Sequence, residues 1–86
     1  MDTIEMNKRA TWTLEHWDPF HIGENAYETE TADVVAYLQS IDHPSELAKR
    51  IQEIYEHSFE EWIPLEKCVE VSYKLIALKY EMKCII

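Results

Sequence analysis

Residues 44–60, PSELAKRIQEIYEHSFE, carry the clearest structural pattern in this chain. Apolar side chains recur there at three- and four-residue spacing, which places them on one face of an α-helix. The preceding Asp42-His43-Pro44 interrupts the chain and provides a new helix start. The sequence therefore predicts a helix over about 44–60, with a core-facing stripe formed by Leu47, Ala48, Ile51, Ile54, Tyr55 and Ser58.

Two helices are predicted before this one, over about residues 3–17 and 29–41. The first ends before Asp18-Pro19, because the residue preceding proline is biased out of the helical region. In the second, Glu30 and Asp33 lie near the positive end of the helix dipole. The expected core-facing residues are Met6, Ala10, Leu14 and Trp17 in the first helix and Thr31, Val34, Val35, Leu38 and Ile41 in the second.

A fourth helix is predicted over about 64–82, opened by Pro64. It carries more than one apolar row, and a helix that is apolar on most sides is central or shared with a partner. The two rows are Val69, Tyr73, Ile76 and Tyr80, and Val71, Leu75, Leu78 and Met82.

The segment 18–23 is expected to form one short helical turn between the first two long helices. Aspartate is a favoured N-cap, proline suits the first helical position, and Gly23 suits a left-handed C′ position. Asp18 would then be the cap. Together these elements predict an all-α fold, a compact four-helix array or bundle with one short extra helical turn.

Composition agrees with a single helical domain over residues 1–86. The chain has 86 residues and 47% hydrophobic residues, but only one glycine, which argues against a protein built from hairpins. The net charge of −9 disfavours nucleic acid and anionic membranes as partners. No run of 18 apolar residues is present, so we expect no membrane span.

Cysteine usage and the N-terminal sequence predict a cytoplasmic protein. Cys68 and Cys84 lie 16 residues apart in a stretch interpreted as one continuous helix, and that spacing corresponds to roughly 24 Å, too far for a disulfide. The first six residues, MDTIEM, lack the order of a signal peptide. A reducing compartment fits both features.

Negative charge is concentrated in residues 10–48, which contain eight acidic residues and no lysine or arginine. Such a region either simply solubilises the surface or attracts a basic protein through long-range electrostatics. Aromatic residues nearby could anchor such a contact, since tryptophan and tyrosine are enriched in binding hot spots. The predicted partner-binding residues are Asp18, Glu24, Tyr27, Glu28, Glu30 and Asp33, with Trp12 and Trp17 as apolar anchors.

Trp12 lies roughly 150° from the core stripe of its helix at 100° per residue. Two alternatives follow: it packs under the long loop, or it belongs to an exposed contact surface. If that surface includes the apolar fourth helix, a homodimer is the simplest way to cover it.

Catalytic and metal-binding motifs are weak. His16, Asp18 and His21 could supply imidazole and carboxylate ligands, but their spacing matches no strong metal motif. No glycine-rich elbow surrounds Ser58, and Cys68 is best interpreted as a small buried side chain. We therefore expect no enzymatic activity, no metal and no cofactor.

Several segments resemble the YugE-like family of small uncharacterised bacterial proteins, over about residues 4–80. The resemblance implies an all-helical cytoplasmic domain and assigns no activity. The matching segments are Glu15-His16-Trp17-Asp18-Pro19-Phe20, Tyr27-Glu28-Thr29-Glu30, Asp33-Val34-Val35, Leu47-Ala48-Lys49-Arg50-Ile51-Gln52-Glu53-Ile54-Tyr55, Ser58-Phe59-Glu60 and Pro64-Leu65-Glu66-Lys67-Cys68.

The leading functional hypothesis is a small acidic protein-interaction or regulatory module that acts through residues 15–33 and their flanking aromatics. An immunity-type inhibitor of a basic toxin is the alternative, because the Trp-Asp-Pro stretch and the following Tyr-x-x-Glu also resemble small immunity proteins. A structural homo-oligomer without a catalytic role is the third.

Overall fold

The computed structural model describes residues 3–84, with the side chains of 3, 24, 25 and 82–84 excepted, and within this range it is all-α. Its elements are α1 (Thr3–Trp17), the short 3₁₀ helix η1 (Glu24–Tyr27), α2 (Glu28–Leu38), α3 (Pro44–Phe59) and α4 (Leu65–Cys84). The predicted four-helix array with one short extra helical turn is confirmed. No described helix is both long and apolar enough to cross a bilayer.

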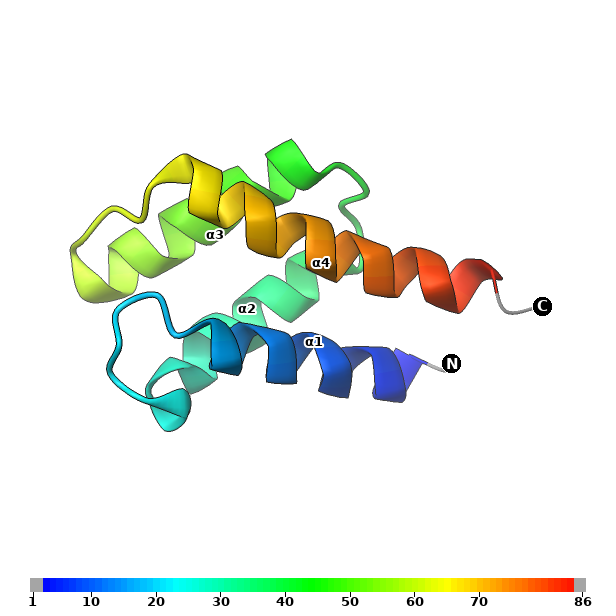
Figure 1. The fold of residues 1–86 in the computed structure, drawn as a ribbon, viewed down its shortest axis with the longest axis horizontal. Coiled ribbons are helices and arrows are strands. Elements are labelled where there is room, and N and C mark those ends of the chain that lie inside the picture. The colour runs from blue at the N-terminus through cyan, green and yellow to red at the C-terminus, as the bar shows by residue number, and fades with distance from the viewer. Residues whose placement is uncertain (1–2, 85–86) are drawn as a thin grey trace.

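The four long helices form two layers (Figure 1), with α1 and α4 in front of α2 and α3. α1 and α4 lie side by side and antiparallel, so that the N-terminal end of α1 and the C-terminal end of α4 lie at the same side of the molecule. Contacts also join α4 to α3, α3 to α2 and α2 to α1. Each long helix therefore packs against two neighbours, around one core.

The core is built from the stripes that the helical periodicity predicted. Leu47, Ile51 and Tyr55 of α3 are fully buried, and Tyr55 packs against Trp17, Phe20, Tyr27 and Phe59. Aromatic pairs at these separations add to the free energy gained by burial alone. The other buried apolar residues are Met6, Ala10, Leu14, Tyr27, Val34, Leu38, Ile41, Ala48, Ile63, Cys68, Val71, Leu75 and Ile76.

The end of the α3 stripe was predicted wrongly. Ser58 is exposed, whereas Phe59 is half-buried and packs on the core. Three residues advance a helix by about 300° and four by about 400°, so Phe59 lies about 40° from Tyr55 and Ser58 about 60° from it on the other side. α3 then stops at Glu60, whose φ of 58° is left-handed.

The position of the extra helical turn was also predicted wrongly. Residues 18–22 form a hydrogen-bonded turn rather than a helix, and the 3₁₀ helix begins at Glu24. Asp18 has a φ of 37°, which is not the extended backbone of a helix N-cap, and the next helical element begins only at Glu24. Gly23, with a φ of 102°, precedes η1 and does not follow a helix. α2 also ends at Leu38, three residues before its predicted end.

α4 is held to the α2–α3 connection by a buried lysine. Lys79 is 7% exposed, and its Nζ donates to the backbone oxygen of Ile41 at 3.0 Å and lies 2.9 Å from Oδ1 of Asp42. Within the described residues, α4 packs mainly on α3 and α1. Tyr73 and Tyr80 lie about 100–120° around α4 from Lys79 and are exposed.

Candidate functional site

The most exposed aromatic side chain of α1 is Trp12, on the helix face opposite Met6, Ala10 and Leu14. Its side chain is 60% exposed, which decides between the two alternatives that the sequence left open. The indole stacks on His16, with ring centroids 4.1 Å apart, and Nδ1 of His16 lies 2.9 Å from the Trp12 carbonyl oxygen. Trp12 therefore lies on the surface, where its stacking on His16 orients the indole, and it does not pack under the loop.

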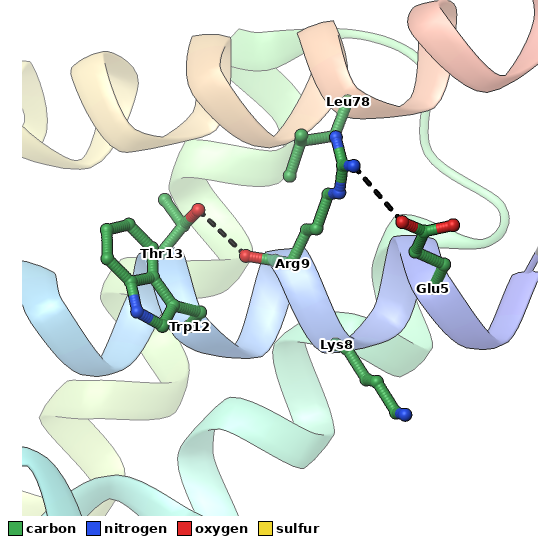
Figure 2. Close-up of a pocket in the computed structure, with 6 residues that line it drawn as sticks. All are labelled: Glu5, Lys8, Arg9, Trp12, Thr13 and Leu78. Atoms are coloured by element: carbon green, nitrogen blue, oxygen red, sulfur yellow. Dashed lines mark hydrogen bonds and ion pairs between the residues drawn. The ribbon is translucent and has the colours of Figure 1, made fainter. Parts of the chain in front are cut away.

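Trp12 borders a groove between α1 and α4. A cavity of about 500 Å³ is lined by Glu5, Lys8, Arg9, Trp12, Thr13 and Leu78 (Figure 2). A second cavity, of about 370 Å³, is lined by Trp12, Thr13, His16, Trp17, Val71, Lys74 and Leu78. Because the two share Trp12, Thr13 and Leu78, we treat them as one feature and call it the Trp12 groove.

The α1 side of the Trp12 groove is ordered by local hydrogen bonds. Arg9 extends from α1 toward Leu78 of α4, and its Nη2 lies 3.1 Å from Oε1 of Glu5 (Figure 2). Thr13 Oγ1 donates to the Arg9 carbonyl oxygen at 2.8 Å. Lys8 points away from α4 (Figure 2). The groove thus has an apolar floor from Leu78 and Trp12 and basic residues at its margin.

Among the predicted contact residues, Asp18 and Tyr27 instead hold the loop before α2. The Tyr27 hydroxyl donates to Oδ1 of Asp18 at 2.6 Å, and the backbone N–H groups of Ile22 and Gly23 donate to the same carboxylate. These hydrogen bonds hold the pKa of Asp18 below its usual value. The Tyr27 hydroxyl has the largest effect, and the two backbone N–H groups have smaller ones. Burial, together with the carboxylate, raises the pKa of Tyr27 to about 12.

The structure therefore corrects part of the predicted binding set. Tyr27 is fully buried and Glu30 is 7% exposed, so neither offers a surface contact. Trp17 is half-buried and packs edge-on against Tyr55, 5.5 Å between ring centroids, because it continues the core stripe of α1. Glu28 and Asp33 are exposed. The side chain of Glu24 lies outside the described residues.

Asp33 belongs to an acidic surface that sequence reasoning did not assemble. With Glu53 and Glu56 of α3 it lines a cavity of about 360 Å³ between α2 and α3, completed by Ile54, His57 and Ser58. The glutamates lie at least 20 positions from Asp33 along the chain, so only the packing of α2 on α3 brings them together. We call this feature the acidic α2–α3 surface.

The residues considered for metal binding or nucleophilic chemistry have structural roles. Among the side chains that the structure describes, no three His, Cys, Asp or Glu residues are arranged to hold a metal ion. His16 is stacked on Trp12, and Asp18 is bound to Tyr27. Cys68 is buried as predicted, and burial raises the pKa of its thiol to about 11, which disfavours the nucleophilic thiolate.

The fold and these surfaces define a small, acidic, all-helical protein with an aromatic groove between its terminal helices. The chain belongs to the family described as Domain of unknown function (DUF1871), whose model matches residues 10–85. It is 46% identical over 71 residues to Uncharacterized protein YugE of Bacillus subtilis (strain 168), covering 83% of each chain. The predicted YugE-like relationship is confirmed.

A solved structure has the same fold. The crystal structure of APC36109 from Bacillus stearothermophilus superposes with a TM-score of 0.89 at 35% sequence identity. The match covers 91% of this chain and 96% of that one. The two chains therefore share the whole four-helix arrangement.

Proposed function

We propose that this protein is a protein-interaction module whose docking site is the Trp12 groove. One observation carries the proposal: an indole that is 60% exposed borders an apolar cavity of about 500 Å³ between two helices. Tryptophan is among the residue types most enriched in binding hot spots, and such anchors act where they border a pocket. The proposal includes no catalytic step and no cofactor, and it places the module in the cytoplasm.

The area of Trp12 supports a hot-spot role. A tryptophan buries roughly 150–250 Å² when it is fully covered, so the exposed part corresponds to roughly 90–150 Å². At about 25 cal/mol per Å², covering this area contributes roughly 2–4 kcal/mol to binding. That range reaches the threshold of about 2 kcal/mol that defines a hot spot.

A second candidate function is inhibition of a basic protein, as an immunity-type inhibitor. The acidic α2–α3 surface favours it, because Asp33, Glu53 and Glu56 converge on one cavity. Exposed carboxylates of one sign speed the approach of a basic partner and lose this effect as salt rises. Glu28, also exposed, adds to the negative charge of α2.

Affinity capture from a host lysate with four matched baits distinguishes these functions. The baits are the unaltered protein, Trp12→Ala, Trp62→Ala and the double variant Asp33→Lys/Glu53→Lys. Trp62 is the control, because it is 62% exposed but lies outside the groove. We expect a captured protein that is lost with Trp12→Ala and retained with Trp62→Ala.

Each other outcome has a defined meaning. A basic protein that is lost only with the double variant, and released by rising salt, supports the inhibitor instead. A bait that captures only itself, at twice its mass or more in solution, supports the structural homo-oligomer. Capture that is identical for all four baits refutes both proposed docking surfaces.

A further inference from the structure

We propose that the partner segment that occupies the Trp12 groove is an acidic amphipathic α-helix. This inference rests on the proposed function and deepens it, because it specifies the chemistry of the occupant. Three properties of the groove support it: the charges of its lining, the spacing of its apolar residues, and its incompatibility with a second copy of the chain.

The groove has a charge opposite to that of the protein. Its lining includes Lys8, Arg9 and Lys74, which are three of the eight lysines and arginines, but only one of the seventeen acidic residues, Glu5. Arg9 is paired with Glu5, whereas neither Lys8 nor Lys74 forms an ion pair within the described part of the chain. Two cations are therefore available to an incoming carboxylate on a chain whose net charge is −9.

The geometry suits a helix better than an extended peptide. α1 and α4 lie side by side and antiparallel, and both are exposed along the front of the molecule (Figure 1). On α4 the groove extends from Val71, which lies beneath it at 2% exposure, to the half-buried Leu78, seven residues and about 10.5 Å along the helix axis. Two turns of a docked amphipathic helix, with apolar residues at i, i+3 or i+4, and i+7, span this length.

The two lysines define where the acidic residues of the occupant belong. Lys74 lies on α4, and Lys8 projects from α1 away from α4 (Figure 2). A helix whose apolar stripe covers Trp12 and Leu78 then has one flank toward each lysine. Glutamates or aspartates on both flanks would meet cations, whereas lysines there would be repelled.

A second copy of this chain is a poor occupant. Two copies with a net charge of −9 each repel one another at low salt. A copy that presented its acidic α2–α3 surface to the groove would form a head-to-tail contact, and such contacts repeat into rings or open chains. A separate protein that supplies an acidic helix avoids both problems.

Selection from a phage-displayed library of random 16-residue peptides tests this inference without assuming a sequence. The unaltered protein is the bait, and Trp12→Ala is used for counter-selection. Selected peptides are synthesised, and their affinities are measured by fluorescence polarisation at 50 and 300 mM NaCl. Circular dichroism reports whether a peptide becomes helical on binding.

We expect peptides with net negative charge, apolar residues at helical spacing and induced helicity. Their affinity should fall at least tenfold with Trp12→Ala and with Lys74→Glu, fall several-fold at 300 mM NaCl, and stay unchanged with Trp62→Ala. Both groove variants change exposed side chains, and their thermal unfolding curves confirm that they fold.

The remaining outcomes separate the inference from the proposed function. Trp12-dependent peptides that are neutral or basic refute the acidic helix but leave the interaction module intact. Recovery of no Trp12-dependent peptide refutes both. Sedimentation that reveals a dimer of the unaltered protein at micromolar concentration, abolished by Trp12→Ala, identifies a second copy as the occupant and also refutes the acidic helix.

Discussion

Replacement of Lys79 by methionine should destabilise the protein through one buried hydrogen bond. Methionine retains the apolar stem but removes the ammonium that donates to the Ile41 carbonyl oxygen at 3.0 Å. A buried acceptor left without its donor costs about 1–3 kcal/mol. The carboxylate of Asp42, which loses its ion pair in this variant, is solvated by water instead, because the side chain is 53% exposed. A loss of about 2 kcal/mol would lower Tm by roughly 8–16 °C in a domain of this size.

Urea unfolding followed by circular dichroism measures this loss against two controls. Lys74→Met, an exposed substitution on the same helix, should change the unfolding free energy by less than about 0.5 kcal/mol. Asp42→Asn should cost less than about 1 kcal/mol, because its carboxylate is largely solvated. Two results would contradict the assigned role of the buried carbonyl contact. In the first, Lys79→Met lowers the unfolding free energy no more than Lys74→Met does. In the second, Asp42→Asn lowers it as much as Lys79→Met does.

Three further predictions concern the core and the loop. Ile51→Ala should reduce the unfolding free energy by about 2–5 kcal/mol in urea titrations, whereas Ser58→Ala should be nearly neutral; similar losses would mean that the α3 stripe is misplaced. The folded-state pKa of Tyr27, about 12, exceeds the usual value of 10, so its stabilising effect is intact below pH 10 and is lost as pH rises toward 12. The unfolding free energy of the unaltered protein should therefore fall more steeply between pH 10 and 12 than that of Tyr27→Phe, and parallel curves would contradict the assignment. In a Cys84→Ser background, Cys68 should react with a thiol reagent at pH 8 only slowly until the protein is denatured, and rapid reaction of the native protein would contradict its burial.

The helices and the centre of the core could be predicted because their signals are local. The α3 stripe of Leu47, Ile51 and Tyr55 repeats every four residues, and this spacing alone places the side chains on one face. Asp18-Pro19 and Pro44 mark helix boundaries through backbone sterics that act between adjacent residues. The prediction failed at Ser58, where positions at i+3 and i+4 from Tyr55 compete and only the direction of the neighbouring helices decides between them.

The candidate site depended much more on tertiary structure. Trp12 was identified from the sequence because it lies off the core stripe of its helix, but its partner across the groove, Leu78, is 66 positions away. Tyr27 was assigned to the surface because it lies in an acidic segment, yet the contact of its hydroxyl with Asp18 allows the ring to be buried. Charge patterning could not reveal this, because the hydrogen bond that offsets the cost of burying the Tyr27 hydroxyl forms only when the loop folds back.

The amino-acid sequence by itself determined the all-helical class, the family, the net charge of −9 and most of the buried stripes. These properties follow from composition and from periodicity within single helices. Only the tertiary structure decided that α1 lies beside α4 and α2 beside α3, which creates the Trp12 groove and the acidic α2–α3 surface. The reason is physical: periodicity gives the face of a helix that is buried, whereas helix packing determines which exposed residues become neighbours.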